Sequence, residues 1–409
     1  MASFKAWVEA LQGAGAEQIV LTDGARQTVK ILPQMGSNLY SYEVDGEEMF
    51  TLPRDYTQTL GFGTPVLFPT PNRVTDCKFT FQGVEYPQHK NGQPKFLHGL
   101  VQDEPFSFDP PTADDASAQA VTYVDFEPGK QIYDSFPWKC RLTLTFTLTA
   151  EGLKLGYQVE NFDEKPLPFG FAIHTYFKRV LPDEQIAIRV QCPERFEAVN
   201  LMPTGKILPT IGTDYDICSD FVSLDKLDLD DVFNGMDSSK TCEARYADGR
   251  HVTLRASDDF KKVVVFTPAG KPIFCMENQT CSTDAHNLYK MCIRDRHLRL
   301  HILSGHIDAA VIPQGIARIQ PGGAQGGCDH EAQSCVGGLE NQLKYTHYGF
   351  PLRCRAPFTA CIPPGVGVHS PAPRGSRGRR KLADQRSLAK RLRATNTPRP
   401  TTASTSSIT

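Results

Sequence analysis

The stretch RLTLTFTLT, Arg141–Thr149, alternates apolar and polar residues without a break. Its apolar members all fall on one side of the alternation: Leu142, Leu144, Phe146 and Leu148. A period of two is typical of a β-strand with one buried face. The next segment, LKLGYQVEN at Leu153–Asn161, repeats the pattern after a link of three residues. Together the two segments predict an antiparallel hairpin.

Similar strand-like runs recur along the first 290 residues: Thr28–Leu32, Val121–Phe126, Ile186–Cys192, His251–Ala256 and Lys262–Thr267. Asp45-Gly46 and Asp248-Gly249 lie between such runs, as expected of hairpin turns. We find no long amphipathic helix, and Phe4–Leu11 is expected to form a helix of two turns at most. Many short strands with Gly, Pro and Asp between them indicate an all-β sandwich or barrel.

The composition, 40% hydrophobic and 22% charged over 409 residues, is that of a globular protein. No run of 18 apolar residues predicts a membrane span, and no secretory signal is recognised, so the expected location is the cytoplasm. The twelve cysteines form no CxxC pair, which argues against a structural zinc site. Neither GxGxxG after a strand nor GxxxxGK[ST] occurs, which argues against nucleotide binding.

The chain divides by charge near residue 290. Residues 291–409 hold 17 basic and 6 acidic residues, whereas residues 1–290 hold 27 and 40. Residues 321–409 are rich in Gly, Pro, Ser and Thr and are predicted to form a basic, largely disordered tail. Met291–Arg296, MCIRDR, looks like translated sequencing adaptor, so a second hypothesis is that the tail is not native sequence.

Four polar residues stand at the ends of apolar runs: Arg73 in GTPVLFPTPNRV, His98 in KFLHGL, His174 in FGFAIHTYFKR and Glu277 in PIFCMENQ. An imidazole titrates near neutral pH, and a carboxylate beside apolar residues has a raised pKa, so His174 and Glu277 suit proton transfer. Taken one at a time, each is at least as well explained as a structural residue: a strand-capping arginine, a core histidine, which is the favoured interpretation of either histidine alone, or an ion-paired glutamate.

In this order and spacing, the motifs resemble those of the aldose 1-epimerase family, the galactose mutarotases and their relatives. The resemblance covers about residues 18–290. Five segments carry it: GTPVLFPTPNR, FLHG, HTYF, DDVF and MENQTCSTDAHN. It implies a large antiparallel β-sandwich over residues 1–290, in agreement with the strand pattern, and an enzyme that interconverts the α and β anomers of a free hexose.

The resemblance also implies a role for each matching residue. Glu277 corresponds to the general base that takes the proton from the C1 hydroxyl, and His174 to the general acid that protonates the ring oxygen. His98 and Arg73 correspond to groups that bind the sugar. Asp230 of DDVF corresponds to the aspartate that holds ring hydroxyls, with Asp231 as the neighbouring alternative.

Ring opening moves protons and no electrons, so we expect neither a cofactor nor a metal ion, and the expected partner is a small aldose sugar. A phosphorylated sugar is disfavoured because no arginine cluster lies near these motifs. Two departures from the family stand out. Asn278 follows Glu277 where the family often has proline, which predicts an altered loop. The family's closing strand should follow Asn287 after a short linker, whereas here MCIRDR intervenes and a weak remnant of the strand lies at 307–320.

Two other functions are compatible with parts of the sequence. A non-catalytic sugar-binding β-sandwich needs polar binding groups but no Glu–His pair, so the presence of both disfavours it. Binding of nucleic acid through the basic tail is the third hypothesis, because nine basic residues and one acid lie between Arg374 and Arg393. The tail lacks interleaved aromatic residues that stack on bases, which argues against nucleic acid as a partner.

Overall fold

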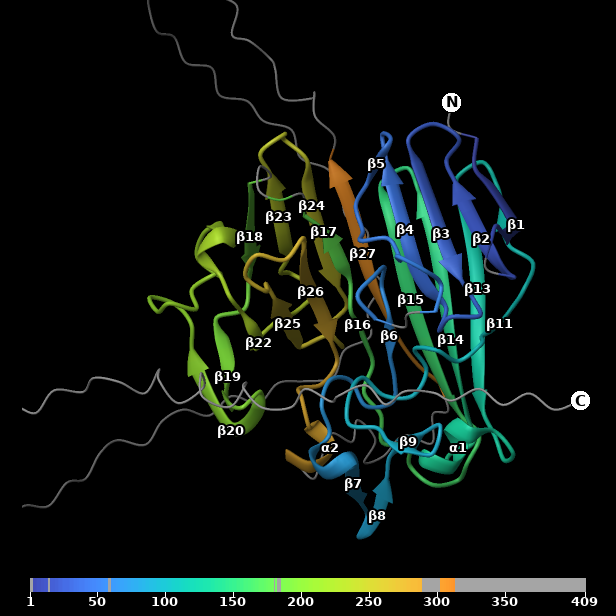
Figure 1. The fold of residues 1–409 in the computed structure, drawn as a ribbon, viewed down its shortest axis with the longest axis vertical. Helices are drawn as coiled ribbons and strands as arrows, with labels where there is room; N and C mark the ends of the chain where they lie inside the picture. Colours follow the sequence, from blue (N-terminus) through green and yellow to red (C-terminus); the bar gives the residue numbers. More distant parts are fainter. Residues whose placement is uncertain are drawn as a thin grey trace, which may run out of the picture. The chain divides into compact units, whose positions relative to one another are not determined.

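The hairpin predicted from the alternating segments lies in the interior of the largest sheet, away from its edges (Figure 1). In the computed structural model, β14 (Cys140–Thr149) pairs with β15 (Gly152–Asn161) along its whole length, and Ala150 and Glu151 form the turn. Every second residue of β14 is buried, as the period of two requires. The prediction of an antiparallel hairpin is confirmed.

The structure describes residues 3–13, 15–57, 60–179, 181 and 185–288, together with the backbone of 302–312. All of them belong to one compact unit, Met1–Ala324. The predicted tail at 321–409 and the MCIRDR segment lie outside the described residues.

Among the described residues, ten strands form the largest sheet: β11 (Ser107–Phe108), β12 (Thr112–Ala113), β13 (Ser117–Phe126), β14, β15, β18 (Ile186–Val190), β21 (Val222–Ser223), β23 (Cys242–Tyr246), β24 (His251–Ala256) and β27 (Ile302–Ile312). A second sheet has eight strands: β6 (Val66–Leu67), β16 (Ala172–Ile173), β17 (Tyr176–Lys178), β19 (Glu194–Val199), β20 (Met202–Pro209), β22 (Asp230–Asn234), β25 (Lys262–Phe266) and β26 (Ile273–Gln279). A third has five: β1 (Lys5–Leu11), β2 (Ala16–Thr22), β3 (Gln27–Leu32), β4 (Asn38–Val44) and β5 (Glu47–Glu48).

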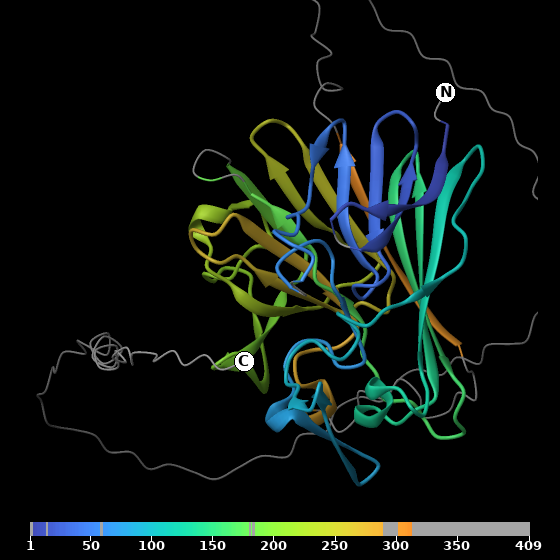
Figure 2. The same cartoon turned by 45° about the vertical axis from the view of Figure 1, so that its right-hand side comes forward.

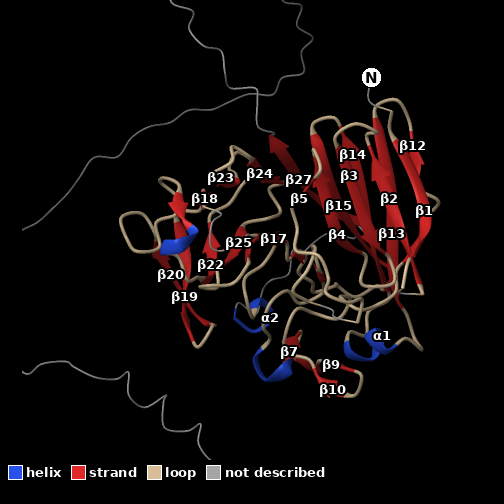
Figure 3. Ribbon diagram, turned by 45° about the horizontal axis from the view of Figure 1, so that its top comes forward, coloured by secondary structure: helices blue, strands red, loops and turns tan. Residues whose placement is uncertain are grey.

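The remaining elements are short. They comprise the hairpins β7 (Lys78–Phe81) with β8 (Val84–Pro87) and β9 (His89–Lys90) with β10 (Gln93–Pro94), the helices α1 (Gln131–Ser135) and α2 (Ala285–Leu288), and two single 3₁₀ turns, Thr75–Cys77 and Leu224–Lys226. Figure 3 shows how little helix accompanies the strands. Over the part of the chain that is described, no helix has the length and apolar character needed to cross a membrane.

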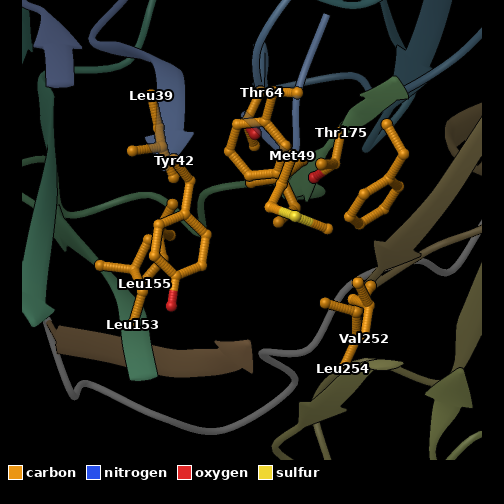
Figure 4. Close-up of a pocket in the computed structure, with 12 residues that line it drawn as sticks. Leu39, Tyr42, Met49, Thr64, Leu153, Leu155, Thr175, Val252 and Leu254 are labelled. Carbon is orange, nitrogen blue, oxygen red and sulfur yellow. The ribbon is translucent and has the colours of Figure 1, made fainter. Parts of the chain in front are cut away.

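The three sheets enclose one hydrophobic core, to which buried residues of each contribute. In Figure 2 the five-stranded sheet lies as a layer over β13, β14 and β15. Between the layers is a small apolar cavity of about 30 Å³, lined by β4, β15, β24 and the β16–β17 segment (Figure 4). Sheets that pack face to face in this way form a β-sandwich. The predicted fold class, an antiparallel β-sandwich, is confirmed.

Strand β27 joins the two halves of the ten-stranded sheet, because it pairs with β15 on one side and with β24 on the other. It overlaps the strand remnant predicted at 307–320 over residues 307–312, and it begins five residues earlier. Residues 313–320 lie outside the described part of the chain. Without β27, both β15 and β24 would present unpaired backbone edges.

The five other strand-like runs coincide with or overlap β3, β13, β18, β24 and β25, and both Asp-Gly pairs lie in hairpin connections. The helix expected at Phe4–Leu11 is wrong, because the segment forms β1 and pairs with β2 from Lys5 to Leu11. Ala6 and Val8 pack against the core. Pairing with β2 satisfies the backbone and directs alternate side chains inward, which a helix of two turns cannot do.

We expect Leu144→Ala to lower the free energy of unfolding by about 2–5 kcal/mol, because Leu144 is fully buried in the core and its loss leaves a cavity. The control is Thr145→Ala, on the other face of β14, for which we expect a loss below about 1 kcal/mol. Urea denaturation measures both. Similar losses in the two variants would contradict the inward orientation of Leu144.

Candidate active site

The segments that carry Arg73 and His98 run side by side. The backbone N–H of His98 donates to the carbonyl oxygen of Asn72 at 2.7 Å, and Arg73 forms an isolated β-bridge with Leu97. His98 has a φ of 66°, in the left-handed region that costs a non-glycine residue about 1–2 kcal/mol. Such strained residues often cluster at functional sites. The hydrogen bond and the β-bridge together join the sequence motifs GTPVLFPTPNR and FLHG into one structural unit.

Strand β26 carries Glu277 and is buried on both of its faces. Phe274 and Met276 belong to the core between the sheets. Successive side chains of a strand point to opposite faces, so Cys275, Glu277 and Gln279 share the other face. The altered loop expected after Glu277 is wrong, because β26 continues through Asn278, which pairs with Val263 of β25.

His174 lies between β16 and β17, beside β26. Ile173 and Thr175 line the cavity between the sheets, where Figure 4 shows Thr175. Because alternate side chains of extended backbone point in opposite directions, His174 and Tyr176 face away from that cavity. Tyr176 pairs in register with Cys275, so its side chain shares the face of β26 that carries Glu277.

The predicted acid and base are in direct contact. Nε2 of His174 lies 3.2 Å from Oε1 of Glu277, and the second carboxylate oxygen of Glu277 accepts from the side-chain amide of Gln279, also at 3.2 Å. The ring of Tyr176 stacks on His174 with centroids 4.3 Å apart, and its hydroxyl lies 3.4 Å from Nε2. The ring of His98 meets that of His174 edge-on, at 5.1 Å.

Arg73 and Asp230 form an ion pair at 3.1 Å. Asp230 and Cys275 lie opposite the same residue of β25, Phe266, which places Asp230 on the face of Glu277. Asp231 lies on the opposite face and pairs with Arg195 at 3.5 Å. Of the two aspartates that the sequence left open, Asp230 is therefore the one beside the other site residues.

Accessibility falls steeply from the ion pair to the acid–base pair. The side chains of Arg73 and Asp230 retain 21% and 28% exposure, whereas those of His174 and Glu277 retain 7% and 1%. A molecule that approaches from solvent therefore meets the ion pair first.

Burial dominates the proton equilibria of the site. It raises the pKa of Glu277 well above its usual range, and the nearby charge of Asp230 raises it further. Burial lowers the pKa of His174 to about 3, and it also lowers that of His98, where His174 and Arg73 add to the effect. At neutral pH, burial therefore favours the uncharged form of the His174–Glu277 pair, in which the imidazole is neutral and the carboxyl group carries the one proton.

All five residues predicted from the sequence thus belong to one cluster. Sequence reasoning missed Tyr176, which stacks on the imidazole, and Gln279, which donates to the carboxylate. Each lies two positions after a predicted catalytic residue. In an extended segment, residues i and i+2 share a face, so this spacing is the signal that identifies them.

A test of burial at His174 uses the pH dependence of stability. In an unfolded chain a histidine titrates near pH 6.5, whereas folded His174 titrates near pH 3. Between these values His174 is protonated in the unfolded chain and neutral in the folded protein, so its contribution to stability falls as the pH falls. We expect His174→Gln to reduce this dependence by about 1.4 kcal/mol per pH unit near pH 4–5, measured by urea denaturation. An unchanged slope would contradict a neutral, buried His174.

The fold is shared with solved structures of low sequence identity. A galactose mutarotase-like protein from Clostridium acetobutylicum is 18% identical, with a TM-score of 0.65, over 76% of this chain and 98% of the other. Galactose 1-epimerase from Lactobacillus acidophilus NCFM is 17% identical, with a TM-score of 0.60, over 76% and 99%. An aldose epimerase homologue from C. elegans is 15% identical, with a TM-score of 0.56, over 76% and 99%.

Comparison with curated proteins gave no match. The family model of aldose 1-epimerase matches residues 17–296, a range that begins within β2, runs through β26 and includes all five predicted site residues. This range agrees closely with the resemblance recognised over residues 18–290. The chain belongs to the aldose 1-epimerase family.

Proposed function

We propose that the protein is an aldose 1-epimerase that interconverts the α and β anomers of a free hexose in the cytoplasm. The observation that carries the proposal is the buried contact of 3.2 Å between His174 and Glu277. The ring oxygen and the hydroxyl oxygen of a hemiacetal are bonded to one carbon, C1. An acid and a base that act on these two oxygens must therefore be neighbours, as this imidazole and this carboxylate are.

The proposed reaction uses the one proton of the pair. In the charged form of the pair, the imidazolium of His174 donates its proton to the ring oxygen, and the carboxylate of Glu277 accepts the proton of the C1 hydroxyl. The bond from C1 to the ring oxygen breaks and an aldehyde forms, which leaves neutral His174 and protonated Glu277. After rotation about the C1–C2 bond, the same steps in reverse close the ring with the opposite configuration.

Burial supports this cycle, because it favours the neutral form in which the pair is left after ring opening. The hydrogen bond that His174 donates to the ring oxygen, and those that Glu277 accepts from the C1 hydroxyl and from Gln279, stabilise the charged form that begins the reaction. The positive charge on His174 and the negative charge on Glu277, which disappear during ring opening, lie only 3.2 Å apart, and the net charge of the pair is constant. No step adds electrons to the sugar or removes them from it, so the reaction requires no cofactor.

The surrounding residues are proposed to bind the sugar. Arg73 and Asp230 offer donors and acceptors at the more exposed end of the cluster, where ring hydroxyls can replace or share their mutual contact. His98 offers its Nδ1, which is buried without a partner, to an oxygen near C1. A free sugar is favoured over a phosphorylated one because Asp230 already balances the charge of Arg73.

A non-catalytic sugar-binding protein is the alternative. It requires hydrogen-bonding groups but gains nothing from an imidazole and a carboxylate buried against each other, an arrangement that is costly to fold. The buried pair therefore favours catalysis over binding alone.

Polarimetry or NMR of freshly dissolved α-glucose and α-galactose tests the proposal. We expect the protein to accelerate anomer equilibration, and we expect Glu277→Gln and His174→Ala to reduce kcat about 100-fold or more, the usual contribution of a general acid or base. Matched controls are Glu243→Gln and His251→Ala. These two residues form another histidine–glutamate pair, 3.9 Å apart in the ten-stranded sheet, and should leave kcat unchanged. Folded protein that leaves the spontaneous rate of both sugars unaltered would refute the proposal.

Steady-state kinetics separate binding from catalysis. We expect Arg73→Ala to raise KM about 10-fold or more with a smaller change in kcat, because a hydrogen bond to a charged group contributes about 1.5–3 kcal/mol. Arg195→Ala is the control, since Arg195 forms the equivalent ion pair with Asp231 on the opposite face of β22. A fall in kcat at constant KM would instead assign Arg73 to the chemical step.

A further inference from the structure

Cys275 is a buried nucleophile that the proposed reaction does not use. Its thiol lies on the same face of β26 as Glu277, two residues away. The donor atoms of His174, Cys275 and Glu277 all lie within 4.8 Å of one another, and all three side chains are buried. The sequence predicted no metal site, because these ligands come from segments about 100 residues apart rather than from a CxxC motif.

The spacing of these atoms is close to that of a zinc site. Zinc binds imidazole, thiolate and carboxylate at about 2.0–2.3 Å, which in tetrahedral geometry separates the donor atoms by about 3.3–3.8 Å. His174 and Glu277 already lie 3.2 Å apart. The sulfur needs to approach the other two donors by at most about 1.5 Å to complete three corners of a tetrahedron.

We propose that His174, Cys275 and Glu277 bind a thiophilic divalent cation of the Zn²⁺ or Cd²⁺ type, which inhibits the enzyme. Three protein ligands leave a fourth position open, as in zinc sites that exchange ligands. The cation occupies the lone pairs that His174 and Glu277 need for proton transfer. Only the inhibitory part of this inference rests on the proposed function, because coordination itself depends on the three donors alone.

The ligand types select the class of cation. A thiolate together with an imidazole favours Zn²⁺ and other soft or borderline ions over Mg²⁺ and Ca²⁺, which prefer oxygen. Coordination requires deprotonated ligands, so the thiol proton and the proton shared by His174 and Glu277 pass to solvent as the cation binds. No electron is transferred, and a chelator reverses the reaction.

The competing explanation is that Cys275 only fills space, as buried cysteines commonly do. Spectroscopy distinguishes the two. We expect the reduced full-length protein, titrated with Cd²⁺, to show thiolate-to-metal absorption in the ultraviolet, and one equivalent of this signal to disappear in Cys275→Ala. The control is Cys242→Ala, which removes a cysteine that is equally buried in β23 and should leave that equivalent in place.

Activity provides a second readout. Saturating Zn²⁺ should slow anomer equilibration by the wild-type protein about 100-fold, the contribution of the blocked acid–base pair, and EDTA should restore the rate. Cys275→Ala should retain its basal rate and lose sensitivity to Zn²⁺ by at least roughly the 10–100-fold that ligand-supporting residues contribute to affinity.

Each outcome decides the inference. A Cd²⁺ signal of the same size in the wild type and in Cys275→Ala means that only other thiols bind, and it overturns the site. Absence of the Cd²⁺ signal in the wild-type protein also overturns the site, and this result does not depend on whether the variant folds. If Cys275→Ala does not fold, Cys275→Ser replaces it as the test variant. A signal that depends on Cys275 in a protein without epimerase activity would support the site while refuting the proposed function. Normal activity that Zn²⁺ leaves unchanged would refute the inhibition alone.

Discussion

The contact between His174 and Glu277 constrains the rest of the structure, which must hold the two side chains in place. An imidazole and a carboxylate 3.2 Å apart and nearly inaccessible to water are held only if the surrounding groups keep their positions. Tyr176 stacks on one member and Gln279 donates to the other, so each is supported by a residue of its own segment. Burial shifts the two pKa values in opposite directions and favours the uncharged form of the pair, with its proton on Glu277.

The sandwich supplies this position because the strand that carries Glu277 is buried on both faces. Phe274 and Met276 anchor β26 in the core, which orients Cys275 and Glu277 toward the site. The β16–β17 segment follows the same rule, with Thr175 toward the core and His174 away from it. The same alternation explains why a thiol lies beside the acid–base pair, because residues 275 and 277 must share a face.

The family's sequence pattern and the structure agree on which residues lie together, and the structure adds detail that the pattern lacks. Motif order alone placed Arg73, His98, His174, Asp230 and Glu277 in one site, and the structure brings all five together. It also separates the two adjacent aspartates, since Asp230 contacts Arg73 whereas Asp231 contacts Arg195 across the sheet. The helix expected at the start of the chain failed because eight residues of mixed polarity have no decisive period, and pairing with β2 then determined the outcome.

The sequence by itself determined what depends on neighbours along the chain: the alternation of β14 and β15, the turns between strands, and the residue types able to exchange protons. Only the tertiary structure decided what depends on neighbours in space. These are the contact of two groups about 100 residues apart, the degree to which each is buried, the partners Tyr176, Gln279 and Cys275, and the insertion of β27 between β15 and β24. The reason is physical: a period of two reports which face a residue takes, whereas distances and burial arise only when the faces of separate strands are packed together.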